Sequence, residues 1–168
     1  MKVLSWNVNS IRVRKDQLLS VIKKENPDII CLQETKTIND LFPKETLKKR
    51  GYFVYVNGVQ SYNGVAIISK FEANQISSHK FCNQNDARHI QANFKNFSIH
   101  SVYVPAGGDI PDIINNEKFD HKLKFLDEMA KFFKFNKNKI NILCGDLNVS
   151  PNEDDVWSHK QLQNVVSH

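Results

Sequence analysis

Three apolar stretches of this sequence run directly into a carboxylate or a carboxamide. They lead into Asn7, into Glu34, and into the pair Asp146 and Asn148. If each stretch is a β-strand, these side chains stand at strand ends. Ligands of open α/β sheets collect outside the carboxyl ends of the strands. We therefore expect the four side chains to converge in one cleft.

The oxygen-rich character of these four residues suits a hard cation. Mg²⁺ prefers one or two carboxylates together with waters and phosphate oxygens. Glu34 and Asp146 can supply carboxylates, and Asn7 a neutral carbonyl oxygen. Asp146 and Asn148 are two residues apart, so on an extended backbone they face the same way. A carboxylate that orients water, beside an amide that donates to a phosphoryl oxygen, suits phosphodiester hydrolysis.

Any one of these segments alone also fits an ordinary turn at a strand end, because Asn and Asp readily bond their own backbone. A single Gly-Asp-x-Asn is therefore weak support for catalysis. All three segments in this order favour a catalytic interpretation over a structural one.

Short strands and two longer helices must position these residues. Apolar, β-prone runs predict strands at 2–5, 28–33, 52–56, 65–69, 89–94, 98–104 and 140–144. Helical periodicity predicts helices at 15–25 and 117–135. In the second helix, an apolar stripe is predicted to face the core: Phe119, Leu123, Leu126, Ala130 and Phe133. The order of elements predicts a mixed α/β fold, with residues 1–168 as a single domain.

Composition and charge narrow the function further. The chain has 168 residues and a formal net charge of +5, which suits a polyanionic partner such as nucleic acid. No apolar run has the length of a membrane span or of a secretory signal, so we expect no membrane partner and a cytoplasmic location. The three cysteines, Cys31, Cys82 and Cys144, are far apart, which argues against a disulfide framework and a cysteine zinc site.

A series of motifs resembles the exonuclease III-type abasic-site (AP) endonucleases of the endonuclease/exonuclease/phosphatase superfamily. In order along the chain they are Ser-Trp-Asn-Val-Asn-Ser-Ile-Arg at 5–12, Leu-Gln-Glu-Thr-Lys at 32–36, Asn-Gly-Val-Ala at 63–66, Tyr-Val-Pro at 103–105 and Gly-Asp-Leu-Asn-Val-Ser-Pro at 145–151. The resemblance runs from residue 1 to the end of the chain. The Gln-Glu-Thr-Lys and Tyr-x-Pro elements are typical of the DNA-repair branch.

The resemblance implies a four-layer α/β sandwich of the DNase I-like kind. It implies a metal-dependent exodeoxyribonuclease III or AP endonuclease of base excision repair, which cuts double-stranded DNA 5′ to abasic sites and from 3′ ends. The cofactor would be Mg²⁺, with Mn²⁺ as a substitute. Asn7 and Glu34 would be metal ligands, while Asp146 and Asn148 would complete the metal site and hold the attacking water and the phosphate.

Two further residues take roles from the resemblance. Tyr103 matches an active-site tyrosine near the scissile phosphate, although a strand-end aromatic with a locally bonded hydroxyl is the plainer interpretation of the residue alone. Arg88 matches a DNA-binding arginine, and a surface ion pair explains it almost as well. Ala87 and Ala106 depart from the family pattern near the DNA face, which affects substrate detail more than chemistry.

Members of the family continue to a second catalytic Asp, an Arg-Ile-Asp strand and a terminal Ser-Asp-His, and this sequence has none of these. We therefore expect the first part of such an enzyme, with its C-terminal strands and helices missing and little activity on its own. Two alternatives stay open. One is a non-catalytic remnant, or one half of a complementing pair whose partner is a separate C-terminal fragment. The other is a phosphodiesterase acting on a small phosphorylated substrate.

Overall fold

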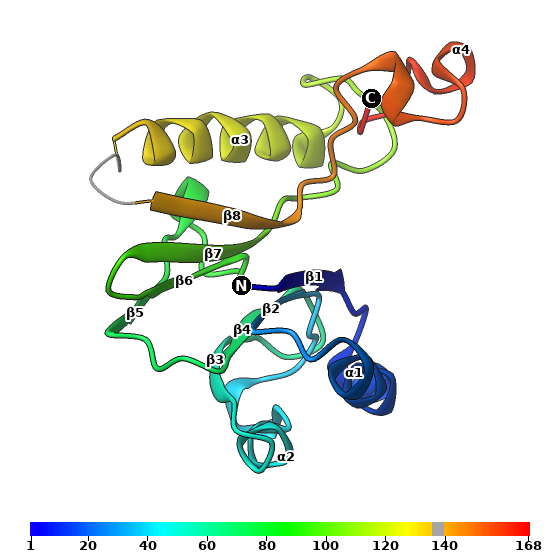
Figure 1. The fold of residues 1–168 in the computed structure, drawn as a ribbon. Coiled ribbons are helices and arrows are strands. Elements are labelled where there is room, and N and C mark those ends of the chain that lie inside the picture. Colours follow the sequence, from blue (N-terminus) through cyan, green and yellow to red (C-terminus); the bar gives the residue numbers. More distant parts are fainter. Residues whose placement is uncertain (136–139) are drawn as a thin grey trace. The chain divides into compact units, whose positions relative to one another are not determined.

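The structure, a computed structural model, describes residues 1–135 and 140–168. The chain forms two compact units (Figure 1). Unit 1 comprises Met1–Lys80, Gln84–Tyr103 and Lys137–Asp146, and unit 2 comprises Phe81–Asn83, Val104–Asn136 and Leu147–His168.

Unit 1 contains all eight strands in the described part of the chain. They are β1 (Val3–Asn7), β2 (Ile29–Gln33), β3 (Phe53–Asn57), β4 (Val65–Ser69), β5 (Gln75–Ser77), β6 (His89–Asn93), β7 (Phe97–Tyr103) and β8 (Ile140–Asp146). Its helices are α1 (Ile11–Glu25), the short α2 (Lys44–Lys48) and a 3-10 turn at Asn39–Leu41. The strands form two four-stranded sheets, sheet A in the order β1-β2-β4-β3 and sheet B in the order β5-β6-β7-β8.

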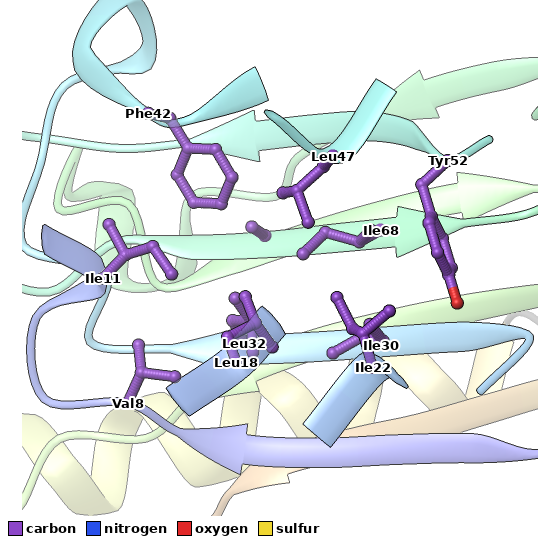
Figure 2. Packing of buried hydrophobic residues seen from close by; sticks show 11 residues of the cluster. Val8, Ile11, Leu18, Ile22, Ile30, Leu32, Phe42, Leu47, Tyr52 and Ile68 are labelled. Atoms are coloured by element: carbon purple, nitrogen blue, oxygen red, sulfur yellow. The ribbon is translucent and has the colours of Figure 1, made fainter. Parts of the chain in front are cut away.

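Sheet A carries helices on one of its faces. The strand β1 pairs with β2 in parallel, and α1 makes the crossover between them. Buried side chains of α1 and α2 meet the near side of β2 and β4 in one apolar cluster (Figure 2). Ile11, Leu18 and Ile22 come from α1, whereas Ile30 and Ile68 come from the two central strands. Burial of this apolar surface is the main stabilising contribution to this layer.

Sheet B lies against the opposite face of sheet A. Alternate residues of β2 and β4 point away from the helices, as the period of two in a strand requires. Ile29 and Ile67 of sheet A pack with Ile90, Ala92 and Ile99 of sheet B in a second apolar cluster. Unit 1 is therefore a three-layer arrangement of helices, sheet A and sheet B (Figure 1).

A directed chain of hydrogen bonds crosses three strands of sheet B on buried imidazoles. The backbone N–H of His79 donates to Nδ1 of His89 over 2.8 Å, so the proton of His89 sits on Nε2. Nε2 of His89 lies 3.0 Å from Nδ1 of His100, and Nε2 of His100 lies 3.2 Å from Oδ1 of Asn141. In each ring Nδ1 accepts a hydrogen bond, so the proton is assigned to Nε2, which donates to the next group. Both rings are therefore neutral Nε2–H tautomers.

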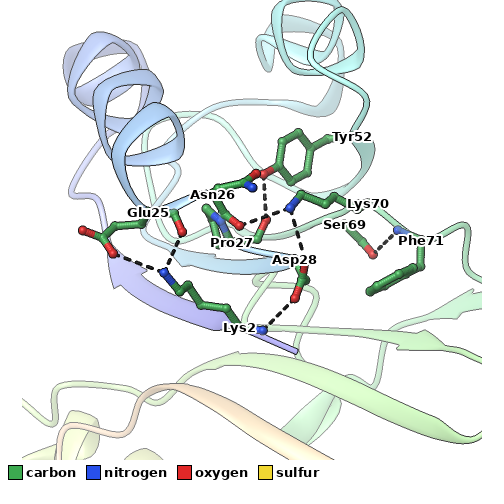
Figure 3. A network of polar contacts seen from close by, with 9 residues as sticks. All are labelled: Lys2, Glu25, Asn26, Pro27, Asp28, Tyr52, Ser69, Lys70 and Phe71. Atoms are coloured by element: carbon green, nitrogen blue, oxygen red, sulfur yellow. Dashed lines mark hydrogen bonds and ion pairs between the residues drawn. The ribbon is translucent and has the colours of Figure 1, made fainter.

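A polar network closes sheet A at the end opposite the carboxyl ends of β1 and β2 (Figure 3). The carboxylate of Asp28 accepts from the backbone N–H of Lys2 over 2.7 Å and from Lys70 Nζ over 3.2 Å. These bonds lower the pKa of Asp28, the backbone bond from Lys2 most of all. The hydroxyl of Tyr52 donates to the carbonyl of Pro27 over 2.7 Å. The end of α1 is thereby tied to the strands that flank it.

Unit 2 is built around the long helix α3 (Glu117–Phe135). It also contains 3-10 turns at Phe81–Asn83 and Glu153–Asp155 and the short helix α4 (His159–Leu162). Phe81 packs on α3, its ring centroid lying 4.6 Å from that of Phe125 and 5.8 Å from that of Phe132. No helix of residues 1–135 and 140–168 is both long and apolar enough to traverse a bilayer.

The mixed α/β fold expected from the sequence is confirmed, and α3 occupies the predicted residues. The three-residue strand β5 and the short helix α2 were not predicted. The predicted core-facing stripe of α3 is wrong in two members, because Leu123 is 42% exposed and Ala130 is exposed. The buried residues of this helix are Lys122 and Phe125.

Candidate active site at the strand ends

The carboxyl ends of parallel strands place the predicted residues in unit 1. The strand β1 ends at Asn7, whose register partner is Gln33, the last residue of β2. The strand β8 ends at Asp146, whose register partner is Tyr103, the last residue of β7. Both parallel pairs therefore finish in polar side chains, as the sequence predicted for such strand ends.

Asn7 links the two acidic residues directly. Its Nδ2 donates to Oε1 of Glu34 over 2.7 Å and to Oδ2 of Asp146 over 2.8 Å. Its Oδ1 accepts from the backbone N–H of Asn9 over 3.0 Å. The carboxamide therefore uses both ends, and residues from three separate strand ends meet at a single nitrogen.

Glu34 is held in a strained turn directly after β2. The backbone φ is +52° at Glu34 and +50° at Lys36, a left-handed conformation that is unusual for residues other than glycine and often marks functional sites. This turn brings Nζ of Lys36 to 2.9 Å from Oε2 of Glu34. Burial raises the pKa of Glu34, but hydrogen bonds from Asn7, Lys36 and Tyr103 outweigh it and leave the pKa below its ordinary value.

A neighbouring turn supports this conformation from behind. The backbone N–H groups of Thr35 and Lys36 donate to the carbonyls of Gly64 and Asn63 over 3.0 and 2.9 Å. Gly64 has a φ of +87°, and a Cβ there would lie 2.3 Å from Oγ1 of Thr35. Only glycine fits this position, so the Asn-Gly pair that predicts a turn also fixes the loop that carries Glu34.

Tyr103 and Arg88 form the side of the site next to Glu34. The Tyr103 hydroxyl is hydrogen-bonded to Glu34, and burial, followed by this bond, raises the pKa of Tyr103 to about 12. The Arg88 guanidinium carbon lies 4.8 Å from the centre of the Tyr103 ring. Nε of Arg88 is 2.6 Å from Oδ2 of Asp86, and Nη1 donates to the Tyr103 carbonyl over 3.2 Å. The phenol is thus a neutral donor beneath an oriented cation.

Sequence reasoning missed a buried polar link between the two sheets. Nε2 of Gln33 donates to Oγ of Ser101 over 3.0 Å, and this hydroxyl donates to the carbonyl of Leu32 over 3.1 Å. The signal was present, since Gln33 is a polar residue at the end of an apolar run. The role of Lys36 was also missed, because its position depends on the left-handed turn.

Glu34, Asp146 and Asn7 are the predicted metal-binding residues that unit 1 brings together. In residues 1–135 and 140–168 there is no group of three or more His, Cys, Asp and Glu side chains that could hold an ion. Glu34 and Asp146, bridged by Asn7, match the one or two carboxylates that Mg²⁺ takes. Asn7 turns its nitrogen toward both carboxylates, so in this conformation it serves as a donor to the ligands instead of offering an oxygen.

Asn148 belongs to unit 2 and has a well-defined setting there. Its side-chain Nδ2 donates to the backbone carbonyl of Val104 over 2.8 Å. The backbone carbonyl of Asn148 accepts from Nζ of Lys122 over 2.6 Å. Its backbone φ is +50°. Of the six predicted site residues, the structure therefore joins five in unit 1 and fixes the sixth through contacts within unit 2.

Several known proteins similar to this chain are named as nucleases. The exodeoxyribonuclease III of Haemophilus influenzae is 30% identical over 93% of this chain. An exodeoxyribonuclease of Bacillus subtilis is 35% identical over 98% of it. The solved structure of an AP endonuclease from Archaeoglobus fulgidus superposes with a TM-score of 0.90 over 99% of the chain, at 34% identity.

The chain spans 60% of the Haemophilus protein and 65% of the Bacillus and Archaeoglobus proteins. Proteins of this exonuclease III and AP endonuclease group generally depend on a divalent metal. The family model described as "Endonuclease/Exonuclease/phosphatase family" matches residues 4–165. The strand-end site lies within that match, and the chain belongs to the endonuclease/exonuclease/phosphatase family.

Proposed function

We propose that this chain carries the metal-binding part of a DNA-repair nuclease that hydrolyses phosphodiester bonds 5′ to abasic sites and at 3′ ends. The observation that carries this proposal is the meeting of Glu34 and Asp146 at the Asn7 amide nitrogen. The names of the similar proteins and the net charge of +5 support DNA as the substrate.

Each residue has a separate task in this proposal. Glu34 and Asp146 hold Mg²⁺, or Mn²⁺ in its place, which when bound neutralises charge that develops on the phosphate. Asn7 keeps the two carboxylates at a fixed spacing. The neutral Tyr103 hydroxyl donates a hydrogen bond near the scissile phosphate, and Arg88 contacts the DNA backbone from a position set by Asp86.

Asp146 and Asn148 take the two roles that concern the attacking water. Asp146 accepts a hydrogen bond from the water or takes its proton. Asn148 donates to a non-bridging phosphate oxygen as negative charge grows there. The water is thereby oriented before it attacks, and the phosphate is held by neutral donors that need no reorganisation.

The chain's 60–65% coverage of the similar proteins supports a further proposal, that activity requires an added C-terminal segment. The test uses a labelled duplex with one abasic site. The purified chain is assayed alone, mixed with the unmatched part of the Bacillus protein, and fused to that part. We expect incision only when the segment is present and Mg²⁺ is supplied, and loss of incision when the metal is chelated.

Within the active form, Glu34→Ala should lower cleavage by more than about 100-fold at limiting Mg²⁺. Losing a group that merely supports a metal ligand already costs about 10–100-fold. Glu45→Ala on α2 is the matched control, because Glu45 is exposed and its carboxylate pairs only with Lys48 in the described structure. Cleavage by Glu34→Ala at the rate of the control would remove Glu34 from the site.

The alternatives give different results in the same assay. A non-catalytic remnant would leave every combination inactive. A phosphodiesterase for small substrates would hydrolyse inositol phosphates in preference to the abasic duplex. Robust incision by the chain alone would contradict the proposed need for a second segment and leave the proposed chemistry standing.

A further inference from the structure

Lys122 is a buried cation in the middle of unit 2. It lies on α3, and only 2% of its surface is exposed. Its Nζ is 2.6 Å from the carbonyl oxygen of Asn148, 2.8 Å from that of Val166 and 3.2 Å from that of Ala106. An ammonium group has three N–H donors, and here three carbonyls from three separate segments surround it. Burial of a charge is costly unless it is bonded in this way.

The loop that follows Tyr103 approaches the Lys122 side chain closely at a glycine. Gly107 has a φ of +94°, and a Cβ there would lie 2.8 Å from Cδ of Lys122. The Gly107 carbonyl accepts a hydrogen bond from Nδ2 of Asn116 over 2.8 Å, which fixes the loop above the lysine stem. Gly107 therefore leaves room for the Lys122 side chain because it has no Cβ, and the hydrogen bond from Asn116 holds it in place.

The same loop also orients the side chain of Asn148. The carboxamide nitrogen of Asn148 donates to the carbonyl of Val104, and Lys122 binds both the carbonyl of Asn148 and that of Ala106. Val104 and Ala106 are two residues apart on the segment that follows β7. The backbone and the side chain of Asn148 are thus fixed against the same segment, in a left-handed conformation that asparagine adopts less readily than glycine.

From this geometry we infer that Lys122 is a positioning residue for the Asn148 carboxamide. The inference rests on the proposed function only for the role of Asn148 in phosphate binding, and the geometric part stands without it. The ammonium holds the backbone carbonyl of Asn148 at 2.6 Å. With the backbone fixed in this way, the side-chain amide nitrogen faces the backbone carbonyl of Val104. Without the ammonium, the three backbone carbonyls each lose a donor, and Asn148 loses the shortest of the three bonds.

The test follows the side-chain amide resonances of asparagine by NMR in the 168-residue chain. In Lys122→Met the chemical shift of the Asn148 side-chain amide should move toward that of an exposed asparagine. The shift of the Asn116 side-chain amide should stay unchanged, because its bonds to Gly107 and Ile110 remain. Lys134→Met, at an exposed lysine near the end of α3, is the matched control. An unmoved Asn148 amide overturns the inference. Loss of both amide signals together also overturns it, because Lys122 then stabilises the unit as a whole.

Lys122→Arg keeps the test valid if the methionine variant does not fold. It retains the charge but carries a larger, planar head group, so the Asn148 amide should move more than the Asn116 amide. In the complemented nuclease, the same variants should lower kcat by about 10–100-fold with little change in KM for DNA. An inactive wild-type complex would count against the proposed function, and the NMR result would still decide the role of Lys122.

Discussion

The two units of this chain differ in the kind of polar side chain that they bury. Among the described residues of unit 1, no Asp, Glu, Lys or Arg side chain is buried. Its buried histidines, His89 and His100, are neutral, and each carries its proton on Nε2 within a chain of hydrogen bonds. Unit 2 places a cation in its interior and surrounds it with backbone carbonyls at Lys122. Unit 1 contains two apolar clusters between its layers, whereas unit 2 combines aromatic packing of Phe81 on α3 with polar side chains that tie loops to that helix.

The two units should therefore be sensitive to different kinds of substitution. In unit 1, a lost methyl group leaves a cavity between packed layers. In unit 2, a lost amide or ammonium takes a donor away from several backbone carbonyls. The candidate carboxylates lie in the unit that contains the apolar layers, and Asn148 lies in the unit where hydrogen bonds hold its backbone and side chain.

The largest effect should come from the apolar layer of unit 1. Ile30→Ala should lower the free energy of unfolding by about 2–5 kcal/mol, because Ile30 is a fully buried residue of β2 that packs against α1. Denaturant unfolding followed by the fluorescence of Trp6, which packs on the same cluster, measures the change in a Trp157→Phe background. Val13→Ala on the exposed side of α1 is the control. Equal losses in both variants would contradict the layered packing.

Acid should weaken unit 1 through its neutral histidines. Burial, and then the neighbouring His100 and His79, lower the pKa of His89 to about 3 from an ordinary value of 6.5. The unfolded chain then binds a proton below pH 6.5 that the folded chain refuses, so stability is lost as the pH falls from 6.5 toward 3. Between pH 7 and pH 5, His89 should cost about 2 kcal/mol, and the lowered pKa of His100 acts in the same direction.

The measurement is the free energy of unfolding at pH 7, 6 and 5 in the wild type and in His89→Gln. The variant should show a flatter dependence on pH. His168→Gln removes a histidine of unit 2 and serves as the control. A variant whose stability falls as steeply as that of the wild type would show that His89 does not produce the acid sensitivity.

A smaller effect should come from the polar ties of unit 2. Asn116 caps α3, because its Oδ1 accepts from the backbone N–H groups of Lys118 and Phe119 while its Nδ2 holds the carbonyls of Gly107 and Ile110. Asn116→Ala should lower stability by about 1 kcal/mol, the usual cost of a lost N-cap. Hydrogen exchange in the first turn of α3 reports the change.

Asn116→Asp separates the two functions of this residue. It keeps the capping oxygen and lacks the N–H donors for the loop. First-turn protection should therefore return toward the wild-type level, while the loop amides near Gly107 remain less protected than in the wild type. Identical behaviour of the alanine and aspartate variants would contradict a separate role for the loop bonds.

The sequence predicted most of unit 1, because strand runs and turn residues act locally. The Asn-Gly pair at 63–64 and the apolar run before Glu34 are local signals, and the structure contains the turn and the strand that they predict. The strand β5 and the helix α2 have only three and five residues, too few for a periodic pattern. The meeting of Glu34 and Asp146 followed from the rule for strand ends.

The features that sequence reasoning missed depend on contacts between distant segments. The orientation of the Asn7 amide is set by the N–H of Asn9 and by two carboxylates, one of them 139 residues away. The stripe predicted on α3 was wrong at Leu123 and Ala130, and it omitted Lys122, which looks like a surface residue in the sequence. Its burial becomes favourable only when three carbonyls have been brought to it.

The link between Asn7 and Asp146 also has a consequence for the order of events during folding. During synthesis, β1 to β7 emerge before β8, so sheet A and three strands of sheet B can form while the site still lacks Asp146. The β7–β8 pair is parallel and needs a long connection, which makes it a slow, non-local step. Asp146 therefore reaches the Asn7 amide only after β8 has paired with β7, so the two acidic residues meet late in the formation of unit 1.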